Sequence, residues 1–327
     1  MITICVDVNG GDEKPAVVLE GIERALAANE DLCVLAAGTP DSGVEAFCES
    51  HDRATALVCS EAIGMDEHPT EAIRTKRDST IVRGCAAVRA GEADGFFLAG
   101  STGAIFAAAT LHVGRVPGIK RPAIACAMPG LAGHETIFMD MGANADCRPE
   151  MIAQFAAMGS AYAKTELGVD NPRVALLSNG TEDTKGSESA QAAFAACKEV
   201  EGINFVGNCE GTDILMGDLD VIVTDGFTGN VALKTLEGTA KFLVGVLKEY
   251  ASSSILSAMG ALALKPALKE AAGKLSGDAH GGAVLLGLKA PVLIGHGATS
   301  PTAVCNGTLA AAAAVSSGLV ERLTNAN

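Results

Sequence analysis

Glycines and small polar residues gather in the turns that follow the apolar runs of this sequence. Three of these turns are Asn9-Gly10-Gly11-Asp12, Gly100-Ser101-Thr102-Gly103 and Asp225-Gly226-Phe227-Thr228-Gly229-Asn230. Glycine lets the backbone come close to a ligand, and a helix that starts after such a turn points unpaired N–H groups at an anion. One turn of this kind is more often ordinary loop chemistry than a site. Several of them on one sheet edge predict a site for an anion the size of phosphate.

A lysine stands in one of four further turns of the same composition. The Gly180–Ser187 stretch is similar to a nucleotide-binding P-loop, but its lysine and glycine are transposed, so we do not predict an ATP site. Lys185 still stands at the start of a predicted helix, where a lysine is suited to bind phosphate. The four turns are Gly142–Asp146, Asn179–Ser187, His280–Gly282 and Gly295–Thr299.

Other catalytic patterns are missing from the sequence. There is no G-x-G-x-x-G dinucleotide fingerprint, no G-x-S-x-G nucleophile elbow and no H-E-x-x-H zinc motif. The aspartates of the polar turns lack the compact spacing of metal ligands, so we interpret them as caps, turn formers or hydrogen-bond partners. We therefore expect neither a metal nor a cofactor. These aspartates are Asp140, Asp146, Asp220 and Asp225.

The composition excludes several classes of protein. With 24 Lys and Arg against 39 Asp and Glu, the net charge of −15 argues against general nucleic-acid binding. Ten cysteines without a C-x-x-C pair are typical of a reducing compartment, and the first residues do not have the pattern of a signal peptide. We predict a cytoplasmic protein that concentrates its basic residues locally to bind acidic substrates. The two candidate groups are Lys76, Arg77 and Arg83, and Arg115, Lys120 and Arg121.

Short apolar runs alternate along the chain with longer segments of helical periodicity. Apolar strands separated by helices favour a mainly parallel sheet covered on both faces, so we predict the α/β class with a three-layer α/β/α architecture. Ligands of open parallel sheets bind beyond the carboxyl ends of the strands, which is where the polar turns lie. Strands are predicted at Ile2–Val8, Leu32–Ala37, Ala54–Cys59, Gly95–Ala99, Ala123–Ala127, Thr136–Met141, Arg173–Leu177, Asp220–Thr224 and Pro291–Gly295. Helices are predicted at Ala16–Ala28, Ser79–Ala90, Ala104–Val113, Glu150–Leu167, Ser189–Val200, Val231–Tyr250 and Thr302–Ser317.

The segment Ser254–Lys274 combines apolar residues at helical spacing with a series of lysines. An apolar face beside lysines suits the interface of a membrane. A dimer contact and burial in the core are the two alternatives that the pattern leaves open. The residues concerned are Ile255, Met259, Leu262, Lys265, Lys269 and Lys274.

The polar turns, taken in their order, resemble the PlsX family of phosphate acyltransferases, and the resemblance spans essentially the whole chain. Its most specific piece is Asp225-Gly-Phe-Thr-Gly-Asn-Val-Ala-Leu-Lys-Thr235. The other matching pieces are Asp7–Asp12, Thr70–Arg74, Lys76–Ser79, Gly100–Ala104, Gly118–Ala123, Asp140–Asn144 with Asp146 and Pro149, Asn171–Val174, Lys185-Gly186, Gly207–Gly211, Gly281-Gly282, Leu285–Gly287 and His296-Gly297.

This resemblance implies an isopropylmalate-dehydrogenase-like fold without a nicotinamide site. It also implies a homodimer that works at the membrane surface in phospholipid synthesis, with acyl carrier protein and inorganic phosphate as partners. The implied reaction converts the acyl thioester of the carrier and phosphate into acyl phosphate and free carrier. We expect one α/β domain, residues 1–327, with a helical protrusion at 236–275.

Residue by residue, the resemblance makes Lys185 and Asn230 the leading catalytic candidates. The substrate-binding candidates are Arg74, Thr102, Asn144, Gly229, Gly281 and Gly282. The sequence departs from the family pattern at Ser101, Ser178–Thr181, Ser187 and His280.

Phosphate is itself the nucleophile in the implied reaction, which fits the missing serine and cysteine signatures. Lys185, Asn230 and helix-terminal N–H groups would hold phosphate against the thioester carbonyl and stabilise the developing oxyanion. Two other functions are alternatives. One is a phosphotransacetylase-like enzyme that acts on short-chain acyl-CoA, and the other is a non-catalytic, membrane-associated scaffold for lipid synthesis.

Overall fold

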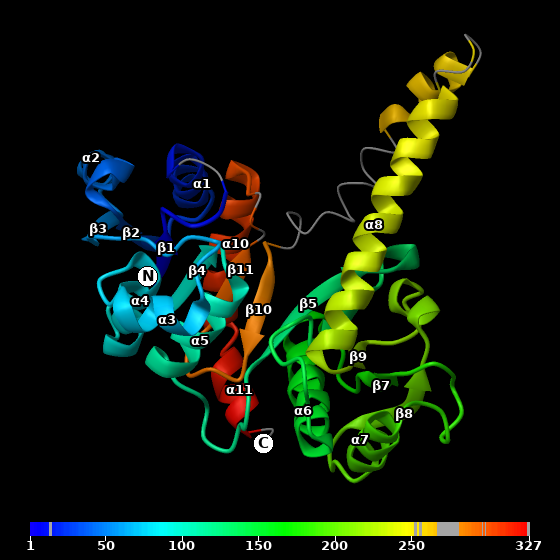
Figure 1. Cartoon of the computed structure of the whole chain (residues 1–327). Helices are drawn as coiled ribbons and strands as arrows, with labels where there is room; N and C mark the ends of the chain where they lie inside the picture. The colour runs from blue at the N-terminus through cyan, green and yellow to red at the C-terminus, as the bar shows by residue number, and fades with distance from the viewer. Residues whose placement is uncertain are drawn as a thin grey trace.

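One eleven-stranded sheet runs through the protein in the order β3-β2-β1-β4-β11-β10-β5-β6-β9-β7-β8 (Figure 1). The computed structural model describes residues 1–12, 15–251, 254, 257–266, 281–295, 297 and 299–325, and the structural statements concern these residues. Seven of the ten strand pairings are parallel, which confirms the predicted mainly parallel sheet. The strands are β1 (Ile2–Asp7), β2 (Leu32–Gly38), β3 (Ala54–Val58), β4 (Gly95–Ala99), β5 (Ala123–Pro129), β6 (Glu135–Met139), β7 (Arg173–Leu177), β8 (Asn204–Cys209), β9 (Val221–Val223), β10 (Ala283–Leu286) and β11 (Val292–Gly295).

Helices cover both faces of the sheet, so the predicted three-layer architecture is confirmed. Along β1, Ile4 and Val6 belong to one core cluster with α1 and α10, whereas Cys5 belongs to another with α4. Because successive side chains of a strand point to opposite faces, a strand that is apolar throughout is buried on both. The helices are α1 (Pro15–Ala28), α2 (Val44–Glu49), α3 (Pro69–Thr75), α4 (Thr80–Ala90), α5 (Thr102–His112), α6 (Pro149–Glu166), α7 (Glu188–Lys198), α8 (Gly226–Ala251), α10 (Pro301–Ser316) and α11 (Leu319–Asn325).

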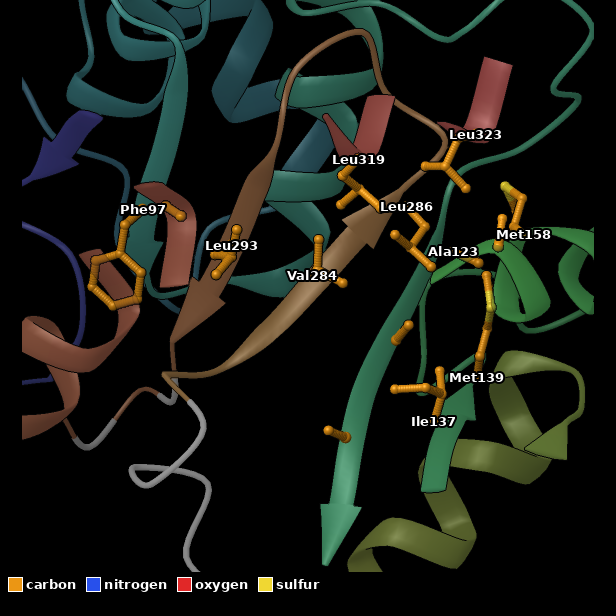
Figure 2. Close-up of a cluster of buried hydrophobic side chains, with 14 of the residues drawn as sticks. Phe97, Ala123, Ile137, Met139, Met158, Val284, Leu286, Leu293, Leu319 and Leu323 are labelled. Atoms are coloured by element: carbon orange, nitrogen blue, oxygen red, sulfur yellow. The ribbon is translucent and has the colours of Figure 1, made fainter. Parts of the chain in front are cut away.

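The largest core cluster is continuous from the first strands of the sheet to the last. Figure 2 shows its middle, where Phe97 of β4 and Leu293 of β11 lie at one end and Met139 of β6 at the other. Val284 and Leu286 of β10 bridge the two ends. The two halves of the sheet therefore share one hydrophobic core. The division into one domain with a protrusion at 236–275 stays a prediction.

The direction of the strands reverses in the middle of the sheet. β5 is antiparallel to both of its neighbours, β10 and β6, and the strands beyond β6 are parallel to β6. The carboxyl ends of β1, β4 and β11 therefore lie at one edge of the sheet, and those of β6, β9 and β7 lie at the opposite edge. The polar turns therefore divide between two edges of the sheet, because the hairpin between β5 and β6 inverts the second half.

A long helix, α8, leaves the body of the protein and projects far beyond it (Figure 1). Residues 257–266 are also helical. Met259 and Leu262 are exposed, which excludes the core alternative for these residues. Within the predicted surface segment, Ile255, Lys269 and Lys274 lie outside the described residues, as does His280. Whether the exposed face contacts a membrane or a second subunit stays a prediction.

Among the described residues, no single helix combines the length and the apolar character that a membrane span needs. The bent pair of α10 and α11, with an angle of 50° between them, passes by length and composition alone. Residues of both helices, among them Val304 and Leu323, are part of the core.

Candidate active site

A cavity of about 300 Å³ lies at the carboxyl ends of β7 and β9. The turns after these strands form part of its wall, and the first residues of α7 and α8 form another part. Two helix amino termini at one cavity favour an anion, because each presents N–H groups and a positive dipole end. The lining residues are Cys147, Ile152, Leu176, Leu177, Ser178, Asn179, Gly186, Ser187, Ser189, Ala190, Ala193, Thr224, Asp225 and Thr228.

The start of α7 and the turn after β7 form one side of the cavity wall. Ser187 caps the helix, and its hydroxyl accepts a hydrogen bond from the Ala190 N–H at 3.3 Å. Gly186 has a φ of +100°, which favours glycine, and a Cβ there would come within 3.1 Å of the Ser178 Oγ. The Ser178 hydroxyl is buried and makes no hydrogen bond with any residue that the structure describes. Buried hydroxyls are normally satisfied, so this one is suited to a bound ligand.

Lys185 lies in a turn whose backbone accepts hydrogen bonds from two side chains of other elements. The side-chain amide of Asn208, on β8, donates to the Glu182 carbonyl at 2.9 Å. Gln191 of α7 donates to the carbonyl of Thr184 at 2.9 Å. The Lys185 stem lies over Gly180, where a Cβ would come within 2.7 Å of the Lys185 Cγ. The turn is therefore held in place while the half-exposed ammonium group of Lys185, 4.0 Å from the Glu182 carboxylate, stays beside the cavity.

Asp140 organises the loop that follows β6. Its carboxylate is fully buried and accepts hydrogen bonds from the N–H groups of Ile124, Gly142, Ala143 and Asn144 and from the Asn144 amide. Burial raises the pKa of the Asp140 carboxyl, and these hydrogen bonds oppose that rise. The structure agrees with the interpretation of this aspartate as a hydrogen-bond partner.

Asn144 has a structural position within this loop. It is buried, and its amide nitrogen donates to the Pro122 carbonyl and to Asp140, both at 2.8 Å. Its own carbonyl accepts the Gly226 N–H at 2.7 Å. Since both of its amide hydrogens are committed, Asn144 links the β6 loop to the start of α8. A direct role in binding substrate stays a prediction.

Asn230 lies in the first turn of α8 and is exposed to solvent. A Cβ on Gly142 would lie 3.5 Å from the Asn230 Cβ, so the β6 loop is its neighbour. In the turn before it, the Asp225 carboxylate accepts the Thr228 N–H and hydroxyl, both at 2.8 Å. Neither Asn230 nor Lys185 lines the cavity itself, but Thr228 and Gly186 beside them do. The structure thus brings the two turns with the leading candidates to one cavity, and their catalytic roles stay predictions.

The remaining candidates lie at the opposite edge of the sheet. Thr102 begins α5 after β4, and Arg74 is exposed in the last turn of α3. Gly281 and Gly282 precede β10, beside the end of β11. A Cβ on Gly281 would collide with the Asn306 backbone, so the tight packing here already explains this glycine. The structure does not bring these four residues to the cavity.

Of the two basic groups predicted from the sequence, the first is partly paired with carboxylates and the second is exposed. Lys76 pairs with Glu67 at 2.7 Å, and Arg83 pairs with Asp78. Arg115 donates to the backbone carbonyl of Lys120. The two carboxylates reduce the charge that the first group offers to a ligand, whereas a backbone carbonyl leaves the charge of Arg115 unchanged, and Lys120 and Arg121 are exposed. Arg77 donates only to the backbone of Arg74 among the described contacts, which leaves the charges of this pair exposed.

Cys147 lines the cavity but is poorly suited to attack a thioester. Burial raises the pKa of its thiol to about 12, and the nearby carboxylates add to this effect. The thiolate is the nucleophilic form, so this thiol is protonated and inert near neutral pH. We expect Cys147→Ala to keep turnover within about threefold of wild type, since only packing changes. A loss of more than a hundredfold in a steady-state assay would instead indicate an acyl-cysteine intermediate.

Asp7 is a buried carboxyl at the end of β1. Burial raises its pKa to about 7, while a hydrogen bond from the Asn9 N–H at 3.0 Å opposes the shift. The native state therefore holds this proton up to a higher pH than the unfolded chain does. The stability that the protonated form contributes is complete below about pH 4 and is lost as the pH rises through 7.

We expect Asp7→Asn to remove this loss. The free energy of unfolding of the variant should rise relative to wild type by roughly 1–4 kcal/mol between pH 4 and pH 8, because the amide does not ionise. Urea unfolding of both proteins at several pH values measures the difference. A difference that stays constant across this range would contradict the assignment.

Sequence reasoning did not identify several residues that shape the site. Asn208, Gln191 and Cys147 come from β8, α7 and the segment before α6. Asn208 contacts a turn that lies far from it in the sequence, and Gln191 contacts the turn just before its own helix. No sequence motif predicts either side-chain contact. The Gly207–Gly211 piece of the resemblance included Asn208 but gave it no role.

The chain matches one protein family and is similar in sequence to known phosphate acyltransferases. Residues 2–322 match a family described as "Fatty acid synthesis protein". A phosphate acyltransferase from Limosilactobacillus reuteri is 42% identical over 324 residues, which cover 98% of this chain and 94% of that protein. A phosphate acyltransferase from Bacillus licheniformis is 44% identical over 301 residues, which cover 92% and 91% of the two chains.

Solved structures with low sequence identity have the same fold. A phosphotransacetylase from Streptococcus pyogenes gives a TM-score of 0.64 at 16% identity and covers 98% of this chain and 94% of its own. A branched-chain phosphotransacylase from Enterococcus faecalis gives 0.61 at 16% identity, with coverages of 96% and 99%. At this identity the likeness concerns the fold alone, and it agrees with the α/β architecture described above.

Proposed function

Because the chain belongs to the fatty acid synthesis protein family, we propose that it is a phosphate acyltransferase that forms acyl phosphate from inorganic phosphate and an acyl thioester of acyl carrier protein. The relatives at 42–44% identity are named phosphate acyltransferase, and the similarity extends over nearly their full length. That name specifies phosphate as the acyl acceptor. The carrier thioester as donor is the finer part of the proposal.

One observation supports phosphate most directly. The amino termini of α7 and α8 meet at one cavity, the Ser178 hydroxyl in its wall has no partner among the described residues, and Lys185 stands beside it. Helix N–H groups, a hydroxyl and an ammonium group are the donors that a phosphate needs. The Asp225 carboxylate also lines the cavity, but Thr228 occupies both of its oxygens.

The chain's residues suggest a direct transfer. A phosphate oxygen attacks the thioester carbonyl, the carbon–sulfur bond breaks, and the carrier leaves as its thiolate, which then takes a proton from solvent. Lys185 and the helix N–H groups orient the phosphate and neutralise charge that develops on the carbonyl oxygen. The protonated Cys147 takes no covalent part. A thiolate leaves readily, so no strong general acid is required.

Competition between donors tests the finer part of the proposal. We expect purified protein to form acyl phosphate, trapped by hydroxylamine as the hydroxamate, from palmitoyl-acyl carrier protein at least tenfold faster than from acetyl-CoA or palmitoyl-CoA at equal concentration. The hydroxamate yield should rise with phosphate concentration. A preference for acetyl-CoA would favour the phosphotransacetylase-like alternative, and no hydroxamate from any donor would favour the scaffold alternative.

We also propose a cytoplasmic homodimer that contacts the membrane through Ser254–Lys274. Helix α8 and residues 257–266 expose large apolar side chains, and such a surface supports contact with a membrane or with a second subunit. The contact is tested by pelleting the protein with anionic and with neutral lipid vesicles. If the protein pellets with neither kind of vesicle, or if a substitution of Met259 leaves pelleting unchanged, the proposed membrane contact is wrong.

A further inference from the structure

A second pocket, of about 460 Å³, lies between α6, α11 and the turn before β8. Helices α6 and α11 pack against each other there (Figure 1). Lys164 of α6, Arg322 of α11 and Ile203 of the turn line its three sides, and we call it the α6–α11 pocket. None of its lining residues lines the cavity beside Lys185, so the two sites are separate. A volume of this size can hold a small organic molecule.

The side of the pocket that α6 forms follows from helical spacing. Ala157, Ser160 and Lys164 are three and four residues apart, so their side chains lie on one face of the helix. Ala161 lies on the same face, four residues after Ala157. An alanine side chain ends at its Cβ, and the two alanines therefore leave space between α6 and α11. The face combines this space with a hydroxyl and a cation.

The hydroxyl on this face is buried without a partner. Ser160 is 2% exposed, and its Oγ makes no hydrogen bond with any residue that the structure describes. A serine or threonine inside a helix can donate to the carbonyl four residues earlier, as Thr165 of the same helix does to Ala161 at 3.1 Å. Ser160 does not use this option. Because buried hydroxyls are normally satisfied, the free Ser160 hydroxyl points to a polar ligand atom in the pocket.

Two cations stand at the rim of the pocket. Lys164 and Arg322 are exposed, and neither forms an ion pair with a residue in the described part of the chain. The Nε of Arg322 donates to the Ser317 carbonyl at 3.2 Å, which orients the guanidinium group. Glu201 is the one carboxylate among the described lining residues. Two positive groups and one negative group give the lining a net charge of +1, whereas the whole chain carries −15.

We infer that the α6–α11 pocket binds a small organic carboxylate. The Arg322 guanidinium and the Lys164 ammonium group would hold the carboxylate at the rim through charge-assisted hydrogen bonds. The apolar side chains of Ala161 and Ile203 would cover the organic body, and the Ser160 hydroxyl would bind a polar atom further inside. The net charge of +1 suits one negative charge and disfavours a ligand with several.

This inference does not rest on the proposed function, although one helix reaches both sites. Ile152, near the start of α6, lines the cavity beside Lys185, and Lys164, in the last turn, lines the α6–α11 pocket. A ligand in the pocket would contact α6 and α11 together. We therefore expect bound carboxylate to slow amide hydrogen exchange in the last two turns of α6 and in α11.

Calorimetric titration with benzoate and with hexanoate tests the inference on the full-length protein. We expect wild type to bind one carboxylate per chain, and Lys185→Ala to bind it equally well. Arg322→Ala should weaken binding at least about tenfold, because a hydrogen-bonded charge is lost. Arg322→Lys keeps the charge and should recover part of this loss. The matched control is Arg89→Ala, which removes an exposed arginine from the last turn of α4 and should leave the affinity unchanged.

A second variant separates ligand binding from folding. Ser160→Ala should weaken binding by about threefold, the usual effect of one neutral hydrogen bond. The same substitution should not lower the free energy of unfolding, since alanine is the better helix former and leaves no unpaired hydroxyl. Urea unfolding and calorimetry measure the two effects. Unchanged affinity in Ser160→Ala would contradict the contact between its hydroxyl and the ligand.

The charge of the ligand gives the last comparison. Benzamide has the size of benzoate without its charge, and it should bind at least about tenfold more weakly. Four results would overturn the inference. They are no binding of either carboxylate to wild type at up to about 10 mM, equal affinity for benzamide and benzoate, equal affinity of Arg322→Ala and Arg89→Ala, and loss of binding in Lys185→Ala. The last result would place the carboxylate in the cavity beside Lys185.

Discussion

Lys185→Ala should lower the phosphate-dependent turnover of the enzyme by about 10²–10³-fold, the usual loss when one donor to a developing oxyanion is removed. The Lys185 ammonium group is the cation on the turn beside the cavity, and the Glu182 carboxylate is 4.0 Å away from it. Without the ammonium group, the helix N–H groups are left to bind the phosphate with no full positive charge beside them. Initial rates at varied phosphate concentration measure the loss as kcat/KM for phosphate.

Two further variants separate charge from folding. Lys185→Arg keeps the charge and should recover at least tenfold of the lost rate, although the planar guanidinium group fits a lysine site imperfectly. Lys164→Ala removes an exposed lysine from the last turn of α6, away from the cavity, and should stay within about twofold of wild type. If Lys164→Ala and Lys185→Ala lose equal amounts of activity, the loss reflects overall charge.

Gly229→Ala should be the most damaging substitution of a single small residue in α8. Gly229 is buried in the first turn of the helix, and a Cβ there would collide with the backbone carbonyl oxygen of Asp140. A backbone oxygen cannot rotate away, so α8 or the β6 loop must shift. We expect a loss of about 2–4 kcal/mol in the free energy of unfolding, together with a large loss of activity in the protein that still folds. Urea unfolding and steady-state rates measure the two losses.

Gly211→Ala provides the control for this prediction. Gly211 begins a short helical turn, and nothing lies within 4 Å of a Cβ built on it. The added methyl group should change the free energy of unfolding by no more than about 0.5 kcal/mol. Equal stability of Gly229→Ala and Gly211→Ala would contradict the close approach of α8 to the Asp140 loop.

Local patterns predicted most of the fold because they depend on neighbours in the sequence. The strands Gly95–Ala99 and Arg173–Leu177 have the predicted bounds, and β5 and β6 lie within two residues of the predicted ranges Ala123–Ala127 and Thr136–Met141. The strand β10, Ala283–Leu286, was missed because it is only four residues long and follows two glycines. Its antiparallel place between β11 and β5 belongs to the tertiary structure and has no signal in the chain around it.

The site was less predictable because it depends on strand direction. Most polar turns were correctly located after a strand, whereas Gly281 and Gly282 precede β10, and the sequence does not say which edge of the sheet a turn faces. The inversion at β5 and β6 sends Thr102 and Lys185 to different edges. The capping role of Asp225 was predictable, since an aspartate before a helix accepts from its first N–H groups. The contact between Asn208 and the Lys185 turn joins residues from two elements and required the structure.

Release of free carrier thiol from palmitoyl-acyl carrier protein tests the account most directly. Purified wild type is assayed with and without inorganic phosphate, and Lys185→Ala is assayed beside it. Release of the thiol should need phosphate, should equal the acyl phosphate formed and should fall by at least a hundredfold in the variant. Release that is equally fast without phosphate, or that is unchanged in Lys185→Ala, would contradict it.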